Sequence, residues 1–297
     1  MEKVVIFGAN GLLGQSLVKK FGTYYDVVAS SIEKESFIPD LNSEYRPLDL
    51  TDRAATRDFI EEVKPDIIIN TAAFTDVDGC EEYRDLCWDV NVRAVEYIIE
   101  GAARSRPVFI HLSSDYVFDG NNPPYSENDK PNPRGNYARS KLASENLVRG
   151  SELEYQIIRT QILFGIGHRV RFNFVTWVID QLQKENKIRV VHDQVGTPTY
   201  APDCSEAILR LLQKKAFGTY HVSGPDSISR YDFALKIAKI FELDETLIER
   251  ISSDELAQKA PRPYNSTFVI DKLINYSDWM PHSLDEALKL LREEMQK

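Results

Sequence analysis

The chain has 297 residues, 42% of them hydrophobic and 28% charged, and a formal net charge of −10. This composition is typical of a folded globular protein and excludes a disordered chain, and the negative charge disfavours nucleic acid as a partner. No apolar run approaches the length of a membrane span or a signal-peptide core, so we expect a cytoplasmic protein that binds no membrane.

The first elements predict a strand, a glycine-rich turn and a helix. The apolar run Val4 to Phe7 leads into Gly8-Ala9-Asn10-Gly11-Leu12-Leu13-Gly14, which has the spacing G-x-x-G-x-x-G. Glycines let the backbone approach a pyrophosphate closely, and the start of the helix offers free N–H groups and a positive dipole end. We therefore predict a dinucleotide site rather than a plain strand-to-helix turn. The expected contacts in this loop are Gly8, Asn10, Gly11, Leu12 and Gly14.

The second strand, Asp26 to Ala29, runs into Ser30-Ser31 rather than into an acidic residue. An acid here would bond the ribose hydroxyls of NAD and repel the 2′-phosphate of NADP. We therefore predict NADPH as the cofactor, with Ser30 and Ser31 beside it. NADH stays open as an alternative, since Glu33 and Glu35 follow closely.

The next two strand ends supply further cofactor candidates. A helix is expected over Arg53 to Val63, and we place Asp49 and Leu50, just before it, at the adenine. Capping of that helix by Thr51 or Asp52 is the competing interpretation. The buried-strand pattern Pro65 to Asn70 then leads into the small residues Ala72 and Ala73, against which a cofactor could lie.

A long helix over Tyr83 to Arg104 and a buried strand over Val108 to Leu112 complete four alternations of strand and helix, which predicts a parallel, doubly wound sheet. The strand ends at Ser114. Its hydroxyl could hold a substrate carbonyl oxygen beside Tyr137, which lies 23 residues downstream.

Tyr137 and Lys141 are four residues apart at the start of an expected helix, so their side chains share one face. An ammonium near a phenol favours the phenolate, which makes Tyr137 a candidate acid–base group. A free tyrosine titrates near pH 10, so work near neutrality needs about 4 kcal/mol of differential stabilisation. A solvated lysine rarely supplies that much, so we expect a bound cofactor and a water-poor pocket.

The second half predicts a smaller, discontinuous domain. Helices are expected over Phe172 to Lys184, Asp203 to Leu212 and Leu284 to Met295, a strand over Ile188 to Val191, and a return to the sheet at Thr219 to Val222. We assign residues 1–164 and about 195–224 to the dinucleotide-binding domain, and about 165–194 and 225–297 to the substrate domain.

An acidic protein that binds an anion needs local guanidinium groups. Candidates in segments expected to face the ligand are Arg169, Arg171, Arg189 and Arg262, with surface solvation as the alternative for each. Arg262 is the strongest candidate, because prolines on both sides fix its backbone.

Three cysteines, Cys80, Cys87 and Cys204, include no C-x-x-C pair, which predicts plain reduced thiols. The five histidines are scattered, and we expect no metal site.

Whole stretches of the chain resemble the dTDP-4-dehydrorhamnose reductase family, within the extended short-chain dehydrogenases/reductases. The matching segments are PDIIINTAAFTDVDGCEE (65–82), SSDYVFDG (113–120), YSENDKPNPRGNYARSK (125–141), RVVHDQVGTPTY (189–200), GTYHVSG (218–224) and RPYNS (262–266). The resemblance implies a Rossmann-type NAD(P)-binding domain with a smaller sugar-nucleotide domain. It also implies reduction of the C4 ketone of dTDP-4-dehydro-L-rhamnose to dTDP-L-rhamnose.

The resemblance further implies roles for matching residues. Ser114, Tyr137 and Lys141 take the catalytic positions, although the family usually has threonine where Ser114 stands. The implied substrate contacts are Val77, Asp115, Tyr116, Ile162, Asn173, Gln194, Arg262 and Asn265. One departure concerns the sugar, because Gln161-Ile162-Leu163 replaces a tryptophan that the family commonly has after Arg159-Thr160.

Two alternatives stay open, and a homodimer is compatible with both. The first is a nucleotide-sugar epimerase or dehydratase of the same fold. Dehydratases place Asp-Glu after the strand-end hydroxyl, whereas Tyr116 follows Asp115 here. The second is a non-catalytic, NADP-binding subunit resembling the regulatory partner of methionine adenosyltransferase.

Overall fold

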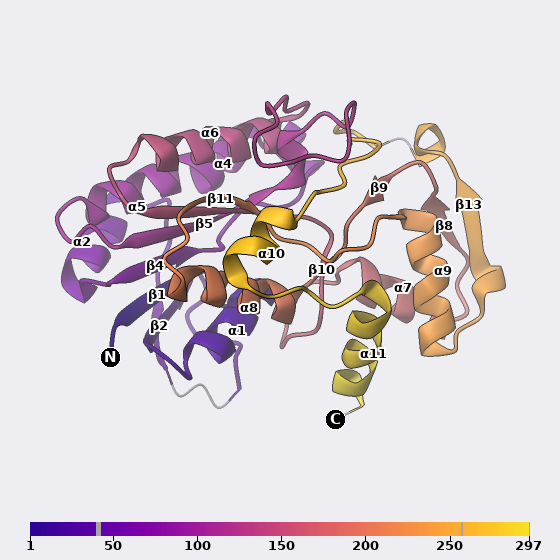
Figure 1. Ribbon diagram of the computed structural model, residues 1–297, viewed down its shortest axis with the longest axis horizontal. Helices are drawn as coiled ribbons and strands as arrows, with labels where there is room; N and C mark the ends of the chain where they lie inside the picture. The colour runs from indigo at the N-terminus through magenta and orange to yellow at the C-terminus, as the bar shows by residue number, and fades with distance from the viewer. Residues whose placement is uncertain (40–42, 257, 297) are drawn as a thin grey trace.

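A seven-stranded parallel sheet forms the larger part of the protein (Figure 1). The structure is a computed structural model that describes residues 1–39, 43–256 and 258–296. The strand order is β11-β6-β5-β4-β1-β2-β3. The strands are β1 (Lys3–Phe7), β2 (Asp26–Ser31), β3 (Glu44–Pro47), β4 (Ile67–Asn70), β5 (Val108–Ser114), β6 (Tyr155–Thr160) and β11 (Gly218–His221). The predicted doubly wound sheet is confirmed, including the return of the chain at β11.

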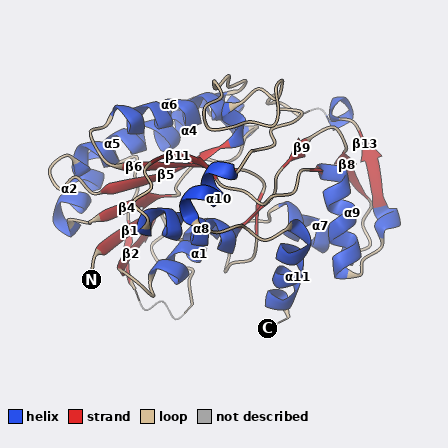
Figure 2. Ribbon diagram, in the orientation of Figure 1, coloured by secondary structure: helices blue, strands red, loops and turns tan. Residues whose placement is uncertain are grey.

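Helices cover both faces of the sheet (Figure 2). One face carries α1 (Leu12–Phe21), α8 (Ala201–Gln213) and α10 (Asp271–Ser277), and the other α2 (Arg53–Val63), α5 (Ala94–Ala102) and α6 (Asn136–Gly150). Val4 and Ile6 pack into the first layer, whereas Val5 and Phe7 pack into the second. Because both sides of β1 are buried, its sequence is a continuous apolar run rather than an alternating one.

The long helix expected over residues 83–104 is present over residues 84–102, as α4 (Arg84–Trp88), a π-helical turn (Asp89–Arg93) and α5 in direct succession. The π-helical turn in its middle was not expected, and the short helix α3 (Gly79–Glu82) precedes α4. Inside the π-helical turn, Asn91 Oδ1 accepts a hydrogen bond from the Phe74 N–H at 2.8 Å, and Asn91 Nδ2 donates to Ser140 Oγ at 3.0 Å. Asn91 thus ties the loop after β4 to helix α6.

A second apolar core lies in a smaller lobe, on the right of Figure 1. Its main elements are α7 (Phe174–Gln183), β8 (Ile188–Val191), α9 (Arg230–Phe241), β13 (Ile248–Ile251) and α11 (Leu284–Met295). Strands β8 and β13 pair in parallel. Two further pairs of short strands complete the fold. Strand β7 (Leu163–Phe164) pairs with β10 (Thr199–Tyr200), and β9 (Val195–Gly196) pairs with β12 (Ile228–Ser229). Single 3₁₀ turns occupy Asp115–Val117, Glu245–Leu247 and Ser253–Leu256.

Helix α10 belongs structurally to the sheet side. It packs against α8 and β11, and Phe268, Ile270 and Leu273 join the sheet's core. We therefore propose a domain division in which about residues 268–277 return to the dinucleotide-binding domain. Among the residues that the structure describes, no helix is long and apolar enough to cross a membrane.

Candidate functional site

The glycine-rich loop joins β1 to α1 at the crevice between β1 and β4, where the strand order reverses. Gly8 has a φ of +76°, and a Cβ there would lie 2.6 Å from Thr71 Oγ1. A Cβ on Gly14 would lie 2.1 Å from the Gly8 carbonyl oxygen. Among the residues that the structure describes, no side chain caps α1, whose N-cap is Gly11, so its first N–H groups are open to an anion. The loop therefore fits the diphosphate of a dinucleotide.

Other predicted cofactor residues surround this loop. The Asn10 N–H donates to Ser31 Oγ at 2.9 Å, and the buried Ser30 hydroxyl has no hydrogen-bond partner among the described residues. Ala72 and Ala73, directly after β4, are only partly buried, as a cofactor-facing backbone requires.

The structure shows which residue before α2 caps this helix, a point that the sequence left open between Thr51 and Asp52. Asp52 accepts a hydrogen bond from the Ala55 N–H and caps α2. Asp49 is exposed and accepts hydrogen bonds from the N–H and hydroxyl of Thr51. The contact of Asp49 and Leu50 with adenine stays a prediction.

The three candidate catalytic side chains lie at the end of β5 and on the first turns of α6. Ser114, Tyr137 and Lys141 are 6%, 9% and 3% exposed. Ser114 Oγ donates to Asp115 Oδ1 at 2.9 Å and accepts from the Tyr116 N–H at 3.2 Å. The hydroxyl of Ser114 is therefore oriented by its neighbours in a site from which water is largely excluded.

The electrostatics of Tyr137 differ from a simple lysine-activated phenol. Burial raises the pKa of Tyr137 above its usual value, and hydrogen bonding with Ser114 opposes this only in part. Lys141 Nζ donates to the Leu112 carbonyl at 2.6 Å, and burial lowers the pKa of this lysine to about 8. Lys141 alone therefore does not supply the stabilisation of the phenolate that work near neutrality requires.

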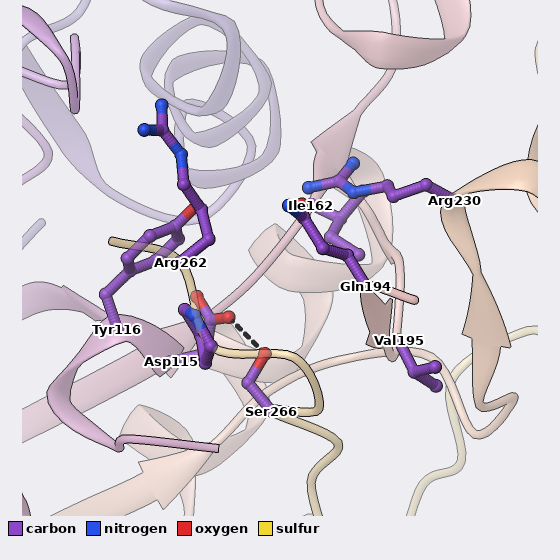
Figure 3. Close-up of a pocket in the computed structure, with 9 residues that line it drawn as sticks. Asp115, Tyr116, Ile162, Gln194, Val195, Arg230, Arg262 and Ser266 are labelled. Atoms are coloured by element: carbon purple, nitrogen blue, oxygen red, sulfur yellow. Dashed lines mark hydrogen bonds between the residues drawn. The ribbon is translucent and has the colours of Figure 1, made fainter. Parts of the chain in front are cut away.

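A pocket opens beside Asp115, between the sheet domain and the smaller lobe (Figure 3). Its lining residues are Asp115, Tyr116, Ile162, Gln194, Val195, Arg230, Arg262, Pro263 and Ser266. Ser266 Oγ donates to Asp115 Oδ2 at 2.6 Å, and burial raises the pKa of the Asp115 carboxyl. Five of the expected substrate residues thus meet in one pocket.

The other three expected substrate residues lie outside this lining. Val77 packs with Tyr116 and Tyr137 in a small cluster of its own. Asn173 caps α7, accepting hydrogen bonds from the backbone N–H groups of its first turn, and its amide donates to the Gly165 carbonyl. Asn265 Oδ1 accepts from the Thr267 N–H. Direct contact of these three with substrate stays a prediction.

Ile162 is held in an unusual backbone conformation with a φ of 45°. A β-branched residue is a steric outlier in this left-handed region, and such strain concentrates at functional sites. Ile162 lines the pocket and occupies the stretch in which the resemblance implies a tryptophan, and its contact with a sugar stays a prediction.

Arg230 is the charged residue among the four pocket residues that the sequence reasoning missed, the others being Val195, Pro263 and Ser266. Its backbone N–H donates to the Gln194 carbonyl at 2.9 Å, and its guanidinium lies 5.0 Å from the ring centre of Phe174. Within the described residues, its side chain makes no hydrogen bond or ion pair. Ser229-Arg230 reads only as the capped start of a helix, so the sequence carried no signal for this role.

Of the arginine candidates from the sequence, one lines the pocket and two lie on the surface. Arg262 lines the pocket and pairs with Asp78. Arg169 and Arg189 are 63% and 50% exposed and pair with surface glutamates, so the alternative of surface solvation holds for them. No group of three or more potential metal ligands occurs among the described residues, and the three cysteines are buried, free thiols.

A doubly wound sheet that brings a glycine-rich loop, a strand-end serine and a Tyr-x-x-x-Lys pair to one edge defines the extended short-chain dehydrogenase/reductase class. Within this class, the chain belongs to the family described as the RmlD substrate binding domain, whose model matches residues 1–297.

Several relatives match along nearly the whole chain. The dTDP-4-dehydrorhamnose reductase of Aggregatibacter actinomycetemcomitans is 32% identical over 98% of this chain and 99% of its own. The crystal structure of dTDP-4-dehydrorhamnose reductase from Bacillus anthracis in complex with NADP is 32% identical, covers 99% of both chains and superposes with a TM-score of 0.88. Methionine adenosyltransferase 2 subunit beta of Bos taurus is 31% identical over 92% of this chain and 81% of its own. The resemblance noted in the sequence is therefore confirmed.

Proposed function

We propose that this protein is an NADPH-dependent reductase of a nucleotide-sugar ketone, and specifically that it reduces the C4 ketone of dTDP-4-dehydro-L-rhamnose to dTDP-L-rhamnose. Whole-length similarity to the reductase of Aggregatibacter actinomycetemcomitans supports the reaction, and the NADP-bound relative from Bacillus anthracis supports the cofactor. The single observation that carries the proposal is the buried serine, tyrosine and lysine beside a pocket with two arginines.

The glycine loop and the open start of α1 would hold the diphosphate of NADPH, with Ala72 and Ala73 against its nicotinamide half. When bound, NADPH supplies the hydride. The protein's part is to hold the ketone at a fixed place in a dry site and to control one proton.

Tyr137 is the proposed proton donor to the ketone oxygen. Ser114 would position that oxygen by donating to it the hydroxyl proton that Asp115 Oδ1 accepts in this structure. Lys141 would bind the nicotinamide ribose, and its positive charge would favour the phenolate that remains after proton transfer. Because the pKa of Lys141 is about 8, the lysine keeps most of its charge at neutral pH.

The nucleotide end of the substrate would lie across the two arginines. Figure 3 shows Arg262 beside Tyr116 on one side of the pocket and Arg230 beside Gln194 on the other. Arg230 would bind one charge of a diphosphate directly, and Arg262 would share its guanidinium between the ligand and Asp78. Their placement meets the need for local positive charge in a protein with a net charge of −10.

The competing functions separate in one assay. Purified protein is incubated with dTDP-4-dehydro-L-rhamnose and stoichiometric NADPH, and the oxidation of NADPH and the sugar product are both followed. A reductase consumes NADPH as the ketone disappears, whereas an epimerase changes the sugar without consuming it.

Similarity to methionine adenosyltransferase 2 subunit beta keeps a non-catalytic binding role as the second candidate. Binding of NADPH without turnover, together with co-purification of a synthetase, would favour that role. The same assay with UDP- and GDP-linked keto sugars tests the base. The cytoplasmic location expected from the sequence stays a prediction, and the oligomeric state, for which the sequence is compatible with a homodimer, stays open.

A further inference from the structure

The segment after β2 folds back and brings a carboxylate to the glycine loop. The Asn10 side-chain amide donates to Glu33 Oε2 at 3.0 Å and to the Glu35 carbonyl at 3.1 Å. Asn10 Oδ1 in turn accepts from the Phe37 N–H at 2.8 Å. Asn10 is 5% exposed, so these contacts hold the returning segment against the loop.

Tyr45 on β3 holds Glu33 from the other side. Its hydroxyl donates to the Glu33 carbonyl at 2.7 Å and accepts from the Asn10 amide at 3.2 Å. Burial, and after it the negative charge of Glu33, raise the pKa of Tyr45. Asn10 therefore holds the Glu33 carboxylate, and Tyr45 holds the backbone carbonyl of the same residue.

In a dinucleotide-binding sheet, a carboxylate just after the second strand has a known role. The acid that bonds the adenosine 2′-hydroxyl, and that repels a 2′-phosphate, lies beyond β2 next to the glycine turn. Here β2 ends in Ser30 and Ser31, and Ser31 Oγ is bonded to the Asn10 N–H. The end of β2 itself therefore supplies no acid. The bond to Asn10 holds the Glu33 carboxylate at the edge of the proposed cofactor site instead.

We propose that Glu33 sets the discrimination between NADH and NADPH in this protein, accepting a hydrogen bond from the 2′-hydroxyl of NADH and opposing the 2′-phosphate of NADPH. The proposal rests on the cofactor site described above. Lys34, next in the chain, is exposed and offers a counter-charge, so the 2′-phosphate is penalised but not excluded. NADH and NADPH should therefore bind with comparable affinity.

Glu35 offers a matched control in the same segment. Only its backbone carbonyl accepts from Asn10, whereas its side chain is 75% exposed and pairs with Arg169 at 3.3 Å. Glu35→Gln removes the same charge and leaves every contact of Asn10 in place.

The test is calorimetric titration of the wild type, Glu33→Gln, Glu33→Ser and Glu35→Gln with NADPH, NADH, 2′,5′-ADP and 5′-AMP. Both Glu33 variants should shift the NADPH-to-NADH affinity ratio at least about tenfold toward NADPH, with the same shift between 2′,5′-ADP and 5′-AMP, because a charge repulsion of about 1.4 kcal/mol is lost. Glu35→Gln should shift either ratio less than about threefold.

The outcomes separate the two claims. If the wild type binds both dinucleotides and the ratios of the Glu33 variants stay at the wild-type value, the role of Glu33 is overturned while the proposed function stands. If the wild type binds none of the four ligands, the cofactor site itself is overturned, and the role of Glu33 with it.

Discussion

Replacing Tyr137 by phenylalanine removes the proposed proton donor and little else. The phenol is 9% exposed, and Ser114 beside it keeps its bonds to Asp115 and to the Tyr116 N–H in the variant. The structural cost is therefore at most about one hydrogen bond, or about 1 kcal/mol of stability. A positioned general acid contributes roughly 10²- to 10⁴-fold, so kcat should fall by that factor, about 3–5 kcal/mol in the barrier.

The assay follows NADPH oxidation at saturating keto sugar, with the affinity for NADPH measured separately. Tyr125→Phe is the matched control, because Tyr125 is 4% exposed and its hydroxyl donates to Asp119 at 3.0 Å, outside the pocket lining. It should lose similar stability and keep kcat. A folded Tyr137→Phe protein that binds NADPH and retains more than about a tenth of the wild-type kcat would refute Tyr137 as the proton donor.

Three further changes test other parts of the account. Arg230→Ala should raise KM for the substrate roughly 10- to 100-fold with kcat little changed, because a charge-assisted bond to the diphosphate is lost; steady-state kinetics that show an unchanged KM would exclude this contact. The pKa of Lys141 is lowered from 10.5 to about 8, so the unfolded chain binds its proton more tightly and the free energy of unfolding should rise between these pH values. Denaturant titrations should show this rise, up to about 3 kcal/mol, relative to Lys141→Met, and parallel curves would contradict it. Glu145→Gln removes the charged partner of the Arg159 guanidinium, which is 1% exposed, and should cost about 3 kcal/mol of stability. The control Glu100→Gln, at an exposed ion pair, should cost less than about 1 kcal/mol. Equal losses of stability in thermal melts would argue against a buried ion pair.

The elements that the sequence predicted well carry their signals locally. The bounds of α2 match the expected Arg53 to Val63, and Asp52 caps it as its residue type suggests. Helix α11 begins after Ser283, which forms a capping box with Glu286. The glycine loop could be predicted because a Cβ at Gly8 or Gly14 would clash with neighbouring backbone, so these positions require glycine.

The features that sequence reasoning missed arise from contacts between distant segments. The π-helical turn follows from the bonds of Asn91 to Phe74 and Ser140, which no periodicity reveals. Arg230 reaches the pocket only because the start of α9 packs beside the loop between β8 and β9, which carries Gln194. Asn173 has a structural role that its motif position did not reveal, since it caps α7, and its contact with substrate stays a prediction.

The most direct test of the central claim is the stoichiometry of NADPH oxidation against sugar reduction with dTDP-4-dehydro-L-rhamnose. The account predicts that NADPH is consumed in equal amount to the ketone and that dTDP-L-rhamnose appears as the product. A sugar that changes while NADPH stays intact, or a protein that binds NADPH and leaves every keto sugar unchanged, would contradict it.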